Sequence, residues 1–424
     1  MDASDPNSAR QSQTTRSGRQ GDVRMRGFAS RHTVDEALRW IDGQAERLPG
    51  EPVALATAAG HILAVDVISP VDVPHFTRAM MDGFAVHSSA TLGASPYNRL
   101  TLAVVGQAMP GHPYSGRVET GQAARIMTGA PMPAGADAVV PAEQAEEAAS
   151  SVHIAGEVPP GKHVGLPGED IRRNDVVLRA GRHLRPQDVG LLASIGSGQR
   201  SVVRKPRVRI VVTGNELLPT GSMPRDSSIP DSNGPMLNAL ITRDGGIARH
   251  PGVVPDLPAA ILDALRDEVD VVVVSGGSSV GVEDHVPRLL VEHGELAIHG
   301  VAMRPSSPTG MGRLDGRLVF LLPGNPVSCF CAYEFFAGRA IRLLGGRDKA
   351  WPYRSVTARL DRKLVSMVGR TDYARVRLVD GRVEPLAIGG AAVLSSTTRA
   401  DGFVVIPPDC EGYPEESDVE VFLY

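Results

Sequence analysis

The segment from Arg207 to Gly346 alternates short, mainly apolar runs with stretches of helical spacing. The apolar runs are RVRIVVTG (207–214), DVVVVSGG (270–277) and Leu318–Leu322, each bounded by turn residues. Helical patterns lie between and after them, at Asn233–Arg243, Pro258–Arg266, Asp284–Glu292 and from Pro326 to about Gly345. Strands that alternate with helices predict a parallel, doubly wound α/β sheet covered by helices.

The loops after these strands are expected to share one edge of the sheet. Ligands of doubly wound sheets bind beyond the carboxyl ends of the strands, which places 213–216, 275–284 and 323–326 together. The loop SGGSSVG (275–281) has the glycine content of a phosphate-binding turn. However, Val282 stands where a P-loop needs lysine, and the dinucleotide pattern G-x-G-x-x-G is absent. The surroundings of the loop must therefore identify its ligand.

Three carboxylates follow or lie near consecutive strand ends, namely those of Glu216, Asp256 and Asp284. Carboxylates that converge on a phosphate loop most often hold Mg²⁺. Asp284 also stands at the start of a predicted helix, where aspartate is a frequent N-cap. The sequence leaves both roles open for this residue.

Other motifs combine turn-forming residues with a possible ligand contact. In LPGNPVS (322–328), Asn325 suits the N-cap of a helix and Pro326 its first position. The motif DSN (231–233) begins another helix, and free N–H groups at such helix starts attract anions. In the first half of the chain, Asp82 lies in a Met-Asp-Gly turn and Thr128 precedes Gly-Ala-Pro. A plain turn explains these two residues equally well.

Composition argues against several classes of function. The 424 residues carry a formal net charge of −4 without a long basic run, so nucleic-acid binding is not expected. Three cysteines, at 329, 331 and 410, do not suit a disulfide framework or a zinc site and favour a reducing compartment. The apolar runs are far shorter than the roughly 18 residues that a membrane span needs. Residues 1–28 lack the apolar stretch of a signal peptide, so we expect a disordered tail and a cytoplasmic location.

The rest of the chain predicts further domains around the α/β segment. A helix with a capping box is expected from Thr33 to Leu48, and short β-like runs separated by Pro and Gly turns follow from Asp72. Short alternating strands after Trp351 suggest a small β-barrel. The expected boundaries are a disordered tail at 1–28, a mixed N-terminal domain at 29–68 and 159–205, an inserted β-domain at 69–158, an α/β domain at 206–350 and a C-terminal β-barrel at 351–424.

Taken together, these motifs resemble the molybdopterin molybdenumtransferase family, which includes MoeA and the E domain of gephyrin. The resemblance runs from about Thr33 to Tyr424 and rests on MDGFAV, RIMTGAPMPAGADAVVP, GEDI, GLLASIG, VVTGNEL, DSN, SGGSSVGVED, LPGNPVS and ADGFVVIPP. It implies a molybdopterin-binding α/β domain at 206–350. It also implies an enzyme that inserts molybdate into adenylylated molybdopterin, with Mg²⁺-dependent release of AMP, to give molybdenum cofactor.

The resemblance further implies partners and residue roles. It implies a homodimer in which Asp82 and Thr128 serve the active site of the other subunit, with a molybdopterin adenylyltransferase and molybdoenzymes as further partners. The implied catalytic residues are Asp82, Thr128, Glu216, Asp256 and Asp284, of which the last three would be metal ligands. The implied substrate-binding residues are Thr213, Gly214, Ser232, Asn233, Ser275, Gly276, Gly277, Ser279, Gly281, Arg304, Pro323, Gly324, Asn325 and Pro326.

Three positions depart from the pattern of this family. Asn215 replaces the usual aspartate of T-G-D-E-L, Ser307 replaces a lysine in the stretch RPSSP (304–308), and Gly300 stands where some members carry another lysine. Because molybdate is a dianion, fewer cations would weaken its capture and leave Arg304 as its main fixed cation. Two alternatives therefore remain: a degenerate paralogue or scaffold that binds the pterin nucleotide without inserting metal, and an adenylyltransferase, against which the extra β-domains argue.

Overall fold

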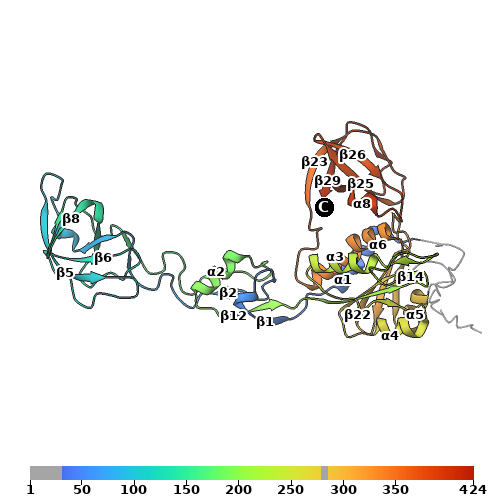
Figure 1. Ribbon diagram of the computed structural model, residues 1–424, viewed down its shortest axis with the longest axis horizontal. Coiled ribbons are helices and arrows are strands. Elements are labelled where there is room, and N and C mark those ends of the chain that lie inside the picture. The colour runs from blue at the N-terminus through green and yellow to red at the C-terminus, as the bar shows by residue number, and fades with distance from the viewer. Residues whose placement is uncertain (1–30, 278–284) are drawn as a thin grey trace, which may run out of the picture. The chain divides into compact units, whose positions relative to one another are not determined.

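The computed structural model describes residues 31–277 and 285–424, and the chain forms two compact units (Figure 1). One unit combines the described part of Met1–Leu48 with Lys205–Tyr424, and the other unit is Pro49–Arg204. Separate hydrophobic clusters lie inside each unit, as is usual for parts of a chain that bury their own cores.

The first unit contains a seven-stranded mixed sheet. Its strands are β13 (Arg207–Thr213), β16 (Ile247–Arg249), β17 (Val253–Val254), β18 (Val271–Ser275), β19 (Glu295–His299), β21 (Gly310–Leu314) and β22 (Arg317–Leu322). They lie in the order β16-β13-β18-β22-β21-β19, with β17 also paired to β13. The pairs of β13 with β16, β17 and β18, and of β18 with β22, are parallel, whereas β21 and β19 pair antiparallel. This is the doubly wound arrangement that the sequence predicted.

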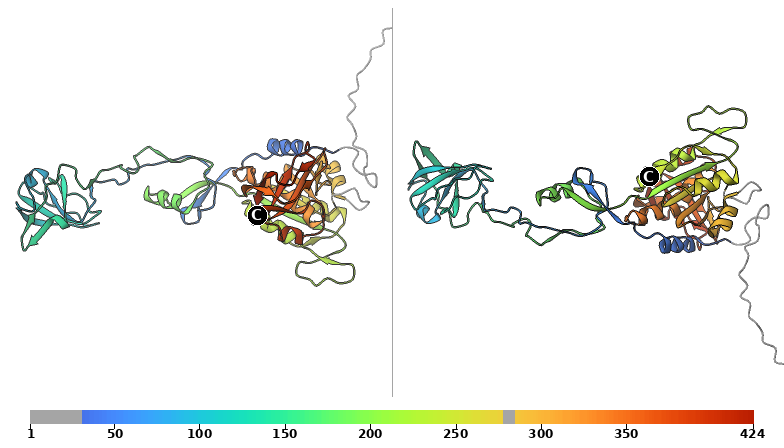
Figure 2. Two further views of the ribbon diagram at one scale, coloured as in Figure 1. Left: turned by 90° about the horizontal axis from the view of Figure 1, so that it is seen from above. Right: turned by 90° about the horizontal axis from the view of Figure 1, so that it is seen from below.

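Helices cover both faces of this sheet (Figure 2). They are α1 (Val34–Gln44), α3 (Asn233–Arg243), α4 (Pro258–Leu265), α5 (His285–His293), α6 (Pro326–Ala332), the π-helix η4 (Tyr333–Ala337) and α7 (Gly338–Leu344). Val271 and Val273 of β18 lie in one core with α1, α3, α6, η4 and α7, whereas Val272 and Val274 lie in a second core with α4 and α5. Alternate side chains of a strand point to opposite faces, so a strand covered on both sides needs an unbroken apolar run.

The predicted elements of this segment are present with small shifts at their ends. Helix α3 spans the predicted residues, and α4 and β22 differ from the prediction by one residue each. The helix predicted from Pro326 is one helical run through Leu344, but its middle is the π-helix Tyr333–Ala337. The sequence did not indicate this change, because one wide turn hardly alters the apolar pattern on either side of it.

Helix α1 begins with the predicted capping box. Thr33 Oγ1 accepts a hydrogen bond from the backbone N–H of Glu36 at 3.1 Å, and the backbone N–H of Thr33 donates to Glu36 Oε2 at 2.7 Å. The apolar face of the helix is buried in the core of the α/β layer through Val34, Ala37 and Ile41. The helix therefore lies in the same unit as that layer, whereas the sequence grouped 29–68 with 159–205. An apolar stripe shows that a helix packs against something, but not against which part of the chain.

The end of the chain forms the predicted β-barrel. A six-stranded sheet contains β20 (Met303–Arg304), β23 (Arg354–Leu360), β25 (Thr371–Val379), β26 (Arg382–Ala387), β27 (Gly402–Ile406) and β29 (Asp418–Leu423). Because β25 pairs with both β26 and β27, the strands β25-β26-β23-β29-β27 close on themselves. Strand β20 comes from the α/β segment and pairs in parallel with β25, which places the loop after Arg304 beside the barrel. The short strands β24 (Leu364–Val365) and β28 (Gly412–Tyr413) pair with each other, and helix α8 (Ser395–Thr398) precedes β27.

The second unit contains a β-sheet inserted into a smaller mixed part. The inserted sheet has the order β7-β4-β6-β5-β9-β8 and comprises β4 (Gly83–Val86), β5 (Leu100–Ala108), β6 (Gln122–Ile126), β7 (Ala138–Pro141), β8 (Ala145–Ala148) and β9 (Ser151–Ile154). The mixed part contains α2 (Pro186–Ser194) and four short strands, β1 (Gly50–Ala54) paired with β12 (Gln199–Val203) and β2 (Val67–Ile68) paired with β11 (Val176–Leu178). Between the two parts, β3 (Arg78–Ala79) pairs with β10 (Val164–Gly165).

Two of the three cysteines are packed inside the first unit. Cys329 and Cys331 are fully buried and free, and burial raises the pKa of both thiols. This environment is that of inert packing residues. Among the described residues, the helices are too short or too polar to cross a membrane.

Candidate functional site at the strand ends

Polar side chains link the carboxyl ends of three parallel strands. Thr213 and Ser275 end β13 and β18 and are buried, and Asn233 begins α3 and is 7% exposed. Asn233 Nδ2 donates to Ser275 Oγ at 2.8 Å and to the carbonyl oxygen of Gly324 at 2.7 Å. Its Oδ1 is buried and accepts no hydrogen bond within the described chain. One carboxamide therefore ties the loops after β18 and β22 to α3 and keeps an acceptor for a ligand.

The loop after β18 crosses the end of β13 at very short range. Gly276 has a φ of +95°, and a Cβ at this position would lie 2.1 Å from the carbonyl oxygen of Thr213. Gly277 follows with a φ of +57°. Only glycine suits a left-handed position with no room for a side chain. Bare backbone of this kind is what anion-binding loops use.

Two of the three predicted acids can be placed at this edge. Asp256 Oδ1 accepts a hydrogen bond from Thr213 Oγ1 at 3.1 Å, so the end of β13 fixes this carboxylate. Glu216 is exposed, and its carboxylate folds back over Gly214, where a Cβ would lie 2.7 Å from Glu216 Oε2. Both carboxylates therefore belong to segments that follow β13 or its partner β17.

The third acid cannot be placed, because Asp284, with Ser279 and Gly281, lies outside the described residues. Within the described ranges, no cluster of three or more His, Cys, Asp or Glu side chains could hold a metal ion. The donors that are present still fit Mg²⁺, which prefers carboxylate oxygens and needs one or two of them when phosphates and waters supply the rest. Glu216 and Asp256 meet that requirement in chemical type.

The starts of α3 and α6 lie at the predicted positions, but the predicted side-chain cap of α6 is not made in the described chain. Asn325 occupies the N-cap of α6 and Pro326 its first position, yet no capping hydrogen bond from the Asn325 side chain occurs in the described chain. At α3, the cap comes from Asp231, whose Oδ1 accepts a hydrogen bond from the N–H of Gly234 at 2.8 Å. Ser232, which the resemblance implied as a substrate-binding residue, holds the N-cap position of α3 without such a bond among the described residues.

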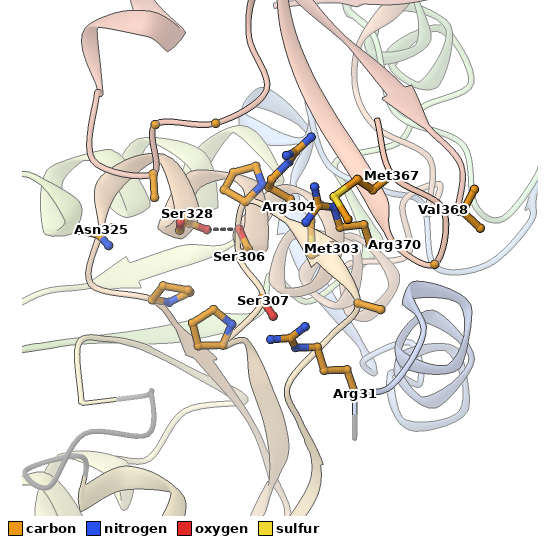
Figure 3. A pocket seen from close by; sticks show the side chains of 18 residues that line it. Arg31, Met303, Arg304, Ser306, Ser307, Asn325, Ser328, Met367, Val368 and Arg370 are labelled. Atoms are coloured by element: carbon orange, nitrogen blue, oxygen red, sulfur yellow. Dashed lines mark hydrogen bonds between the residues drawn. The ribbon is translucent and has the colours of Figure 1, made fainter. Parts of the chain in front are cut away.

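Asn325 instead lines a pocket of about 620 Å³ beside the barrel (Figure 3). Its wall includes three of the predicted substrate-binding residues, Arg304, Pro323 and Asn325, and two further arginines, Arg31 and Arg370. In Figure 3 the guanidinium group of Arg31 points toward Ser307, and Arg304 and Arg370 lie close together. The volume is typical of a small-molecule site, and the guanidinium groups favour an anion.

Arg304 shares a carboxylate with a neighbouring arginine. Its Nη2 donates a hydrogen bond to Oδ2 of Asp372, which is fully buried. Arg370 Nε lies 3.1 Å from the other oxygen of that carboxylate, and Ser366 Oγ donates to Oδ2 at 2.7 Å. Two guanidinium groups on one carboxylate leave a net positive charge in the wall. The barrel thus contributes a second arginine to the wall, beside the Arg304 that the sequence suggested as the main fixed cation.

Several buried donors around the pocket lack an acceptor within the described chain. They include Arg304 Nε, Ser307 Oγ and Arg370 Nη2. Arg375 of β25 is fully buried and donates to the carbonyl oxygen of Gly389 in the pocket wall, but its Nε and Nη1 are unpaired among the described residues. A buried donor without an acceptor costs about 1–3 kcal/mol. An anion is the ligand that would satisfy such a wall.

In the second unit, Asp82 and Thr128 contact each other. Asp82 Oδ1 accepts hydrogen bonds from the backbone N–H and from Oγ1 of Thr128, each at 2.7 Å. First the backbone N–H and then the hydroxyl of Thr128 lower the pKa of Asp82 below its ordinary value. Both residues are exposed. The sequence left the role of these two turns undecided. In the structure they present one ionised carboxylate and one hydroxyl on a shared surface.

Models of protein families match three successive parts of the chain. They are described as the MoeA N-terminal region (domain I and II), the probable molybdopterin binding domain and the MoeA C-terminal region (domain IV), and they match residues 32–196, 209–342 and 357–424. These matches, together with the fold, define a multidomain protein of molybdenum cofactor biosynthesis, built on a molybdopterin-binding α/β domain.

Similarity to individual proteins extends over nearly the whole chain. The molybdopterin molybdenumtransferase of Staphylococcus aureus (strain COL) is 31% identical over 398 residues, which are 92% of this chain and 95% of that protein. A putative molybdopterin biosynthesis protein of Methanocaldococcus jannaschii is 34% identical over 88% of this chain and 91% of its own. The crystal structure of a molybdopterin biosynthesis MoeA protein from Pyrococcus horikosii is similar with a TM-score of 0.81 and 32% identity, covering 93% and 99% of the two chains.

The chain belongs to the MoeA family of molybdopterin molybdenumtransferases. The resemblance inferred from the motifs is therefore confirmed, and with it an enzymatic role in molybdenum cofactor biosynthesis.

Proposed function

We propose that the protein inserts molybdate into adenylylated molybdopterin and releases molybdenum cofactor and AMP. The observation that carries the proposal is the arginine-lined pocket of about 620 Å³. The pocket shares Pro323 and Asn325 with the loops at the carboxyl ends of β13, β18 and β22, which we call the strand-end edge. The edge would hold the pterin nucleotide, and the pocket would hold the oxyanion beside it. Two neighbouring anion sites are what a transfer of molybdate to a pterin nucleotide requires.

The pocket wall supports capture of a dianion despite the missing lysines. Arg304 and Arg370 are held on Asp372, so their planar groups are fixed before a ligand arrives. Such a fork can donate two parallel hydrogen bonds to an oxyanion, which lysine cannot do. The arginines thereby compensate for Ser307 and Gly300. The similar proteins described above give no support to a degenerate paralogue.

The strand-end edge would bind the pterin nucleotide through the remaining predicted residues. Asn233 offers its unpaired Oδ1 to a donor group on the ligand, and the glycine turn at 276–277 offers bare backbone. The other residues that we assign to this binding surface are Thr213, Gly214, Ser232, Ser275, Ser279, Gly281, Gly324 and Pro326.

We assign Mg²⁺ to the same edge, where Glu216, Asp256 and Asp284 would hold it. Bound there, the ion supplies positive charge to phosphate oxygens. Thr213 Oγ1 donates to one oxygen of Asp256, which orients the carboxylate and leaves its other oxygen for the ion. Asn215 cannot contribute a charged ligand, so the demand on Glu216 is greater than in proteins with aspartate at that position.

We further propose a cytoplasmic homodimer in which Asp82 and Thr128 of one subunit serve the strand-end site of the other. Support comes from the family resemblance and from the shared surface that these two residues present. Three free cysteines, two of them buried, fit a reducing compartment. A molybdopterin adenylyltransferase would supply the substrate, and molybdoenzymes would receive the product.

Molybdate dependence tests the pocket assignment. We expect Arg304→Ala and Arg370→Ala each to raise the half-saturating molybdate concentration by about tenfold, or about 1.4 kcal/mol, because each removes part of the fixed positive wall. Ser307→Lys should lower it. AMP release from adenylylated molybdopterin is followed as molybdate is titrated.

The matched control is Arg362→Ala, an exposed arginine of the barrel that pairs with Glu384 and lies outside the pocket wall. It should titrate like the original protein, and binding of the pterin nucleotide should stay unchanged in every variant. Equal half-saturating concentrations in all variants would show that the oxyanion binds elsewhere.

A further inference from the structure

A buried carboxylate and a histidine form a pair directly beside the proposed pterin site. Asp231 precedes α3 and is 3% exposed. Its Oδ2 lies 2.9 Å from Nε2 of His250, which follows β16 and has a side chain that is 14% exposed. Its other oxygen accepts the N–H of Gly234 in the first turn of α3. One carboxylate thus joins the start of a helix to the end of a different strand.

Glycine at position 234 is a steric requirement of this pair. A Cβ on Gly234 would lie 2.2 Å from His250 Nε2 and 2.3 Å from Asp231 Oδ2. Contacts this short do not occur between real atoms, so any side chain at 234 would push the imidazole off the carboxylate. The helical backbone of Gly234 has no other need for glycine, since its φ is not positive. The glycine and the histidine therefore depend on each other.

The pair controls the residue that joins the strand-end loops. Asn233 lies between Asp231 and Gly234 in the turn that the carboxylate caps, and its Nδ2 holds Ser275 Oγ and the Gly324 carbonyl. A capping carboxylate whose other oxygen is held by a second partner leaves the first turn less freedom than a cap alone. The position of the Asn233 carboxamide, with its unpaired Oδ1, is thus set from two sides.

We propose that His250 is a positioning residue for the pterin nucleotide, acting through Asp231 on Asn233. The inference rests on the proposed function for the identity of the ligand. His250 does not contact the substrate in this view; it holds the carboxylate that aligns the first turn of α3. Loss of the pair should weaken binding of the pterin nucleotide and leave the transfer step itself nearly unchanged.

Three variants of the full-length protein test this role. His250→Ala removes the partner of Asp231, Gly234→Ala displaces that partner sterically, and His250→Gln keeps a donor for the carboxylate. We expect the first two to raise the KM for adenylylated molybdopterin, and its dissociation constant in equilibrium dialysis, by about tenfold, with kcat within about twofold. His250→Gln should recover most of the loss. His293→Ala, an exposed histidine at the end of α5, is the control and should match the original protein.

The outcomes separate positioning from a merely structural role. If the pair only stabilises the fold, both alanine variants lose active protein, so kcat per total protein falls while KM stays constant. That result, or an unchanged dissociation constant in both variants, overturns the proposal. If the original protein binds the pterin nucleotide but releases no AMP, the proposed function fails, whereas the dissociation constants still decide the role of His250.

Discussion

Ser306 is the residue at which backbone strain and the arginine-lined pocket coincide. It is 3% exposed and has a φ of +88°, a left-handed conformation that costs a residue with a side chain about 1–2 kcal/mol. Its Oγ donates to the carbonyl oxygen of Ser328 at 2.6 Å, and its own carbonyl accepts a hydrogen bond from Thr309 Oγ1 at 2.7 Å. These bonds hold a strained turn in the pocket wall, as is common at binding sites.

This geometry predicts that glycine is more stable than alanine at position 306, the reverse of the usual order within helices and strands. Both Ser306→Gly and Ser306→Ala lose the hydroxyl bond, but only glycine relieves the strain. Glycine also costs about 0.5–1 kcal/mol in chain entropy, so Ser306→Gly should be the more stable variant by about 0.5–1 kcal/mol. Midpoints of denaturant unfolding measure the difference. At Ser194, the exposed last residue of α2, alanine should be more stable than glycine, and the same order at 306 would contradict the strain argument.

At the residue scale, the sequence predicted the strand-end groups better than the pocket wall. Thr213, Asn233 and Ser275 follow predicted strands or begin a predicted helix, so their meeting at one edge follows from topology. Arg370 and Asp372 meet Arg304 only because β20 pairs with β25, with Asp372 lying 68 residues further along the chain. Local patterns do not contain such a pairing. A signal was nevertheless present, because the strand TDYARV carries two charged residues, Asp372 and Arg375, among apolar ones. The structure buries both of them.

At the scale of elements, α1 offers the clearest test of a local motif. Thr33→Ala should lower the free energy of unfolding by about 1 kcal/mol, because it removes the bond to the N–H of Glu36 at the start of a helix whose apolar face is buried. Thr33→Ser keeps the hydroxyl and should cost much less. Chemical denaturation of the three proteins measures the effect, and equal losses for both variants would show that packing of the threonine methyl group matters more than the cap.

The same capping box predicts a dependence on pH. The backbone N–H of Thr33 and then its hydroxyl lower the pKa of Glu36 from its ordinary value of 4.5. A lowered carboxyl pKa contributes stability above the ordinary value and loses it as the pH falls through the folded value. The contribution of the box should therefore be full at neutral pH and decline below about pH 4.5. The difference between the original protein and Thr33→Ala should shrink in that range.

Element types were predictable where burial imposes one pattern. The strands β13, β18 and β22 read as mainly apolar runs because helices cover both of their faces. The π-helix Tyr333–Ala337 and the packing of α1 were not predictable in the same way. Burial of Tyr333 and Glu334 depends on hydrogen bonds to Asp244 and Arg243, which lie in a different helix and its end. Tertiary partners of this kind decide local geometry after the apolar pattern has been satisfied.

At the scale of the whole molecule, the proposed homodimer predicts complementation between two inactive variants. Asp82→Ala disables the surface of the second unit, and Asp256→Ala disables the strand-end edge of the first. In a hybrid dimer, one of the two sites would combine two intact surfaces. With random exchange of subunits, half of the dimers are hybrids, so AMP release should recover to about a quarter of the original rate.

The matched control mixes Asp82→Ala with Thr128→Ala. Both changes lie on the surface of the second unit, so every site of every hybrid receives one damaged surface, and AMP release should stay at the level of the single variants. Exchange of subunits is verified by native mass spectrometry of the mixtures. Recovery in the control mixture as well as in the first would mean that the variants stabilise each other without sharing a site. No recovery in either, with exchange demonstrated, would mean that each chain builds its active site from its own residues, and the assignment of Asp82 and Thr128 to the other subunit would then have to be abandoned.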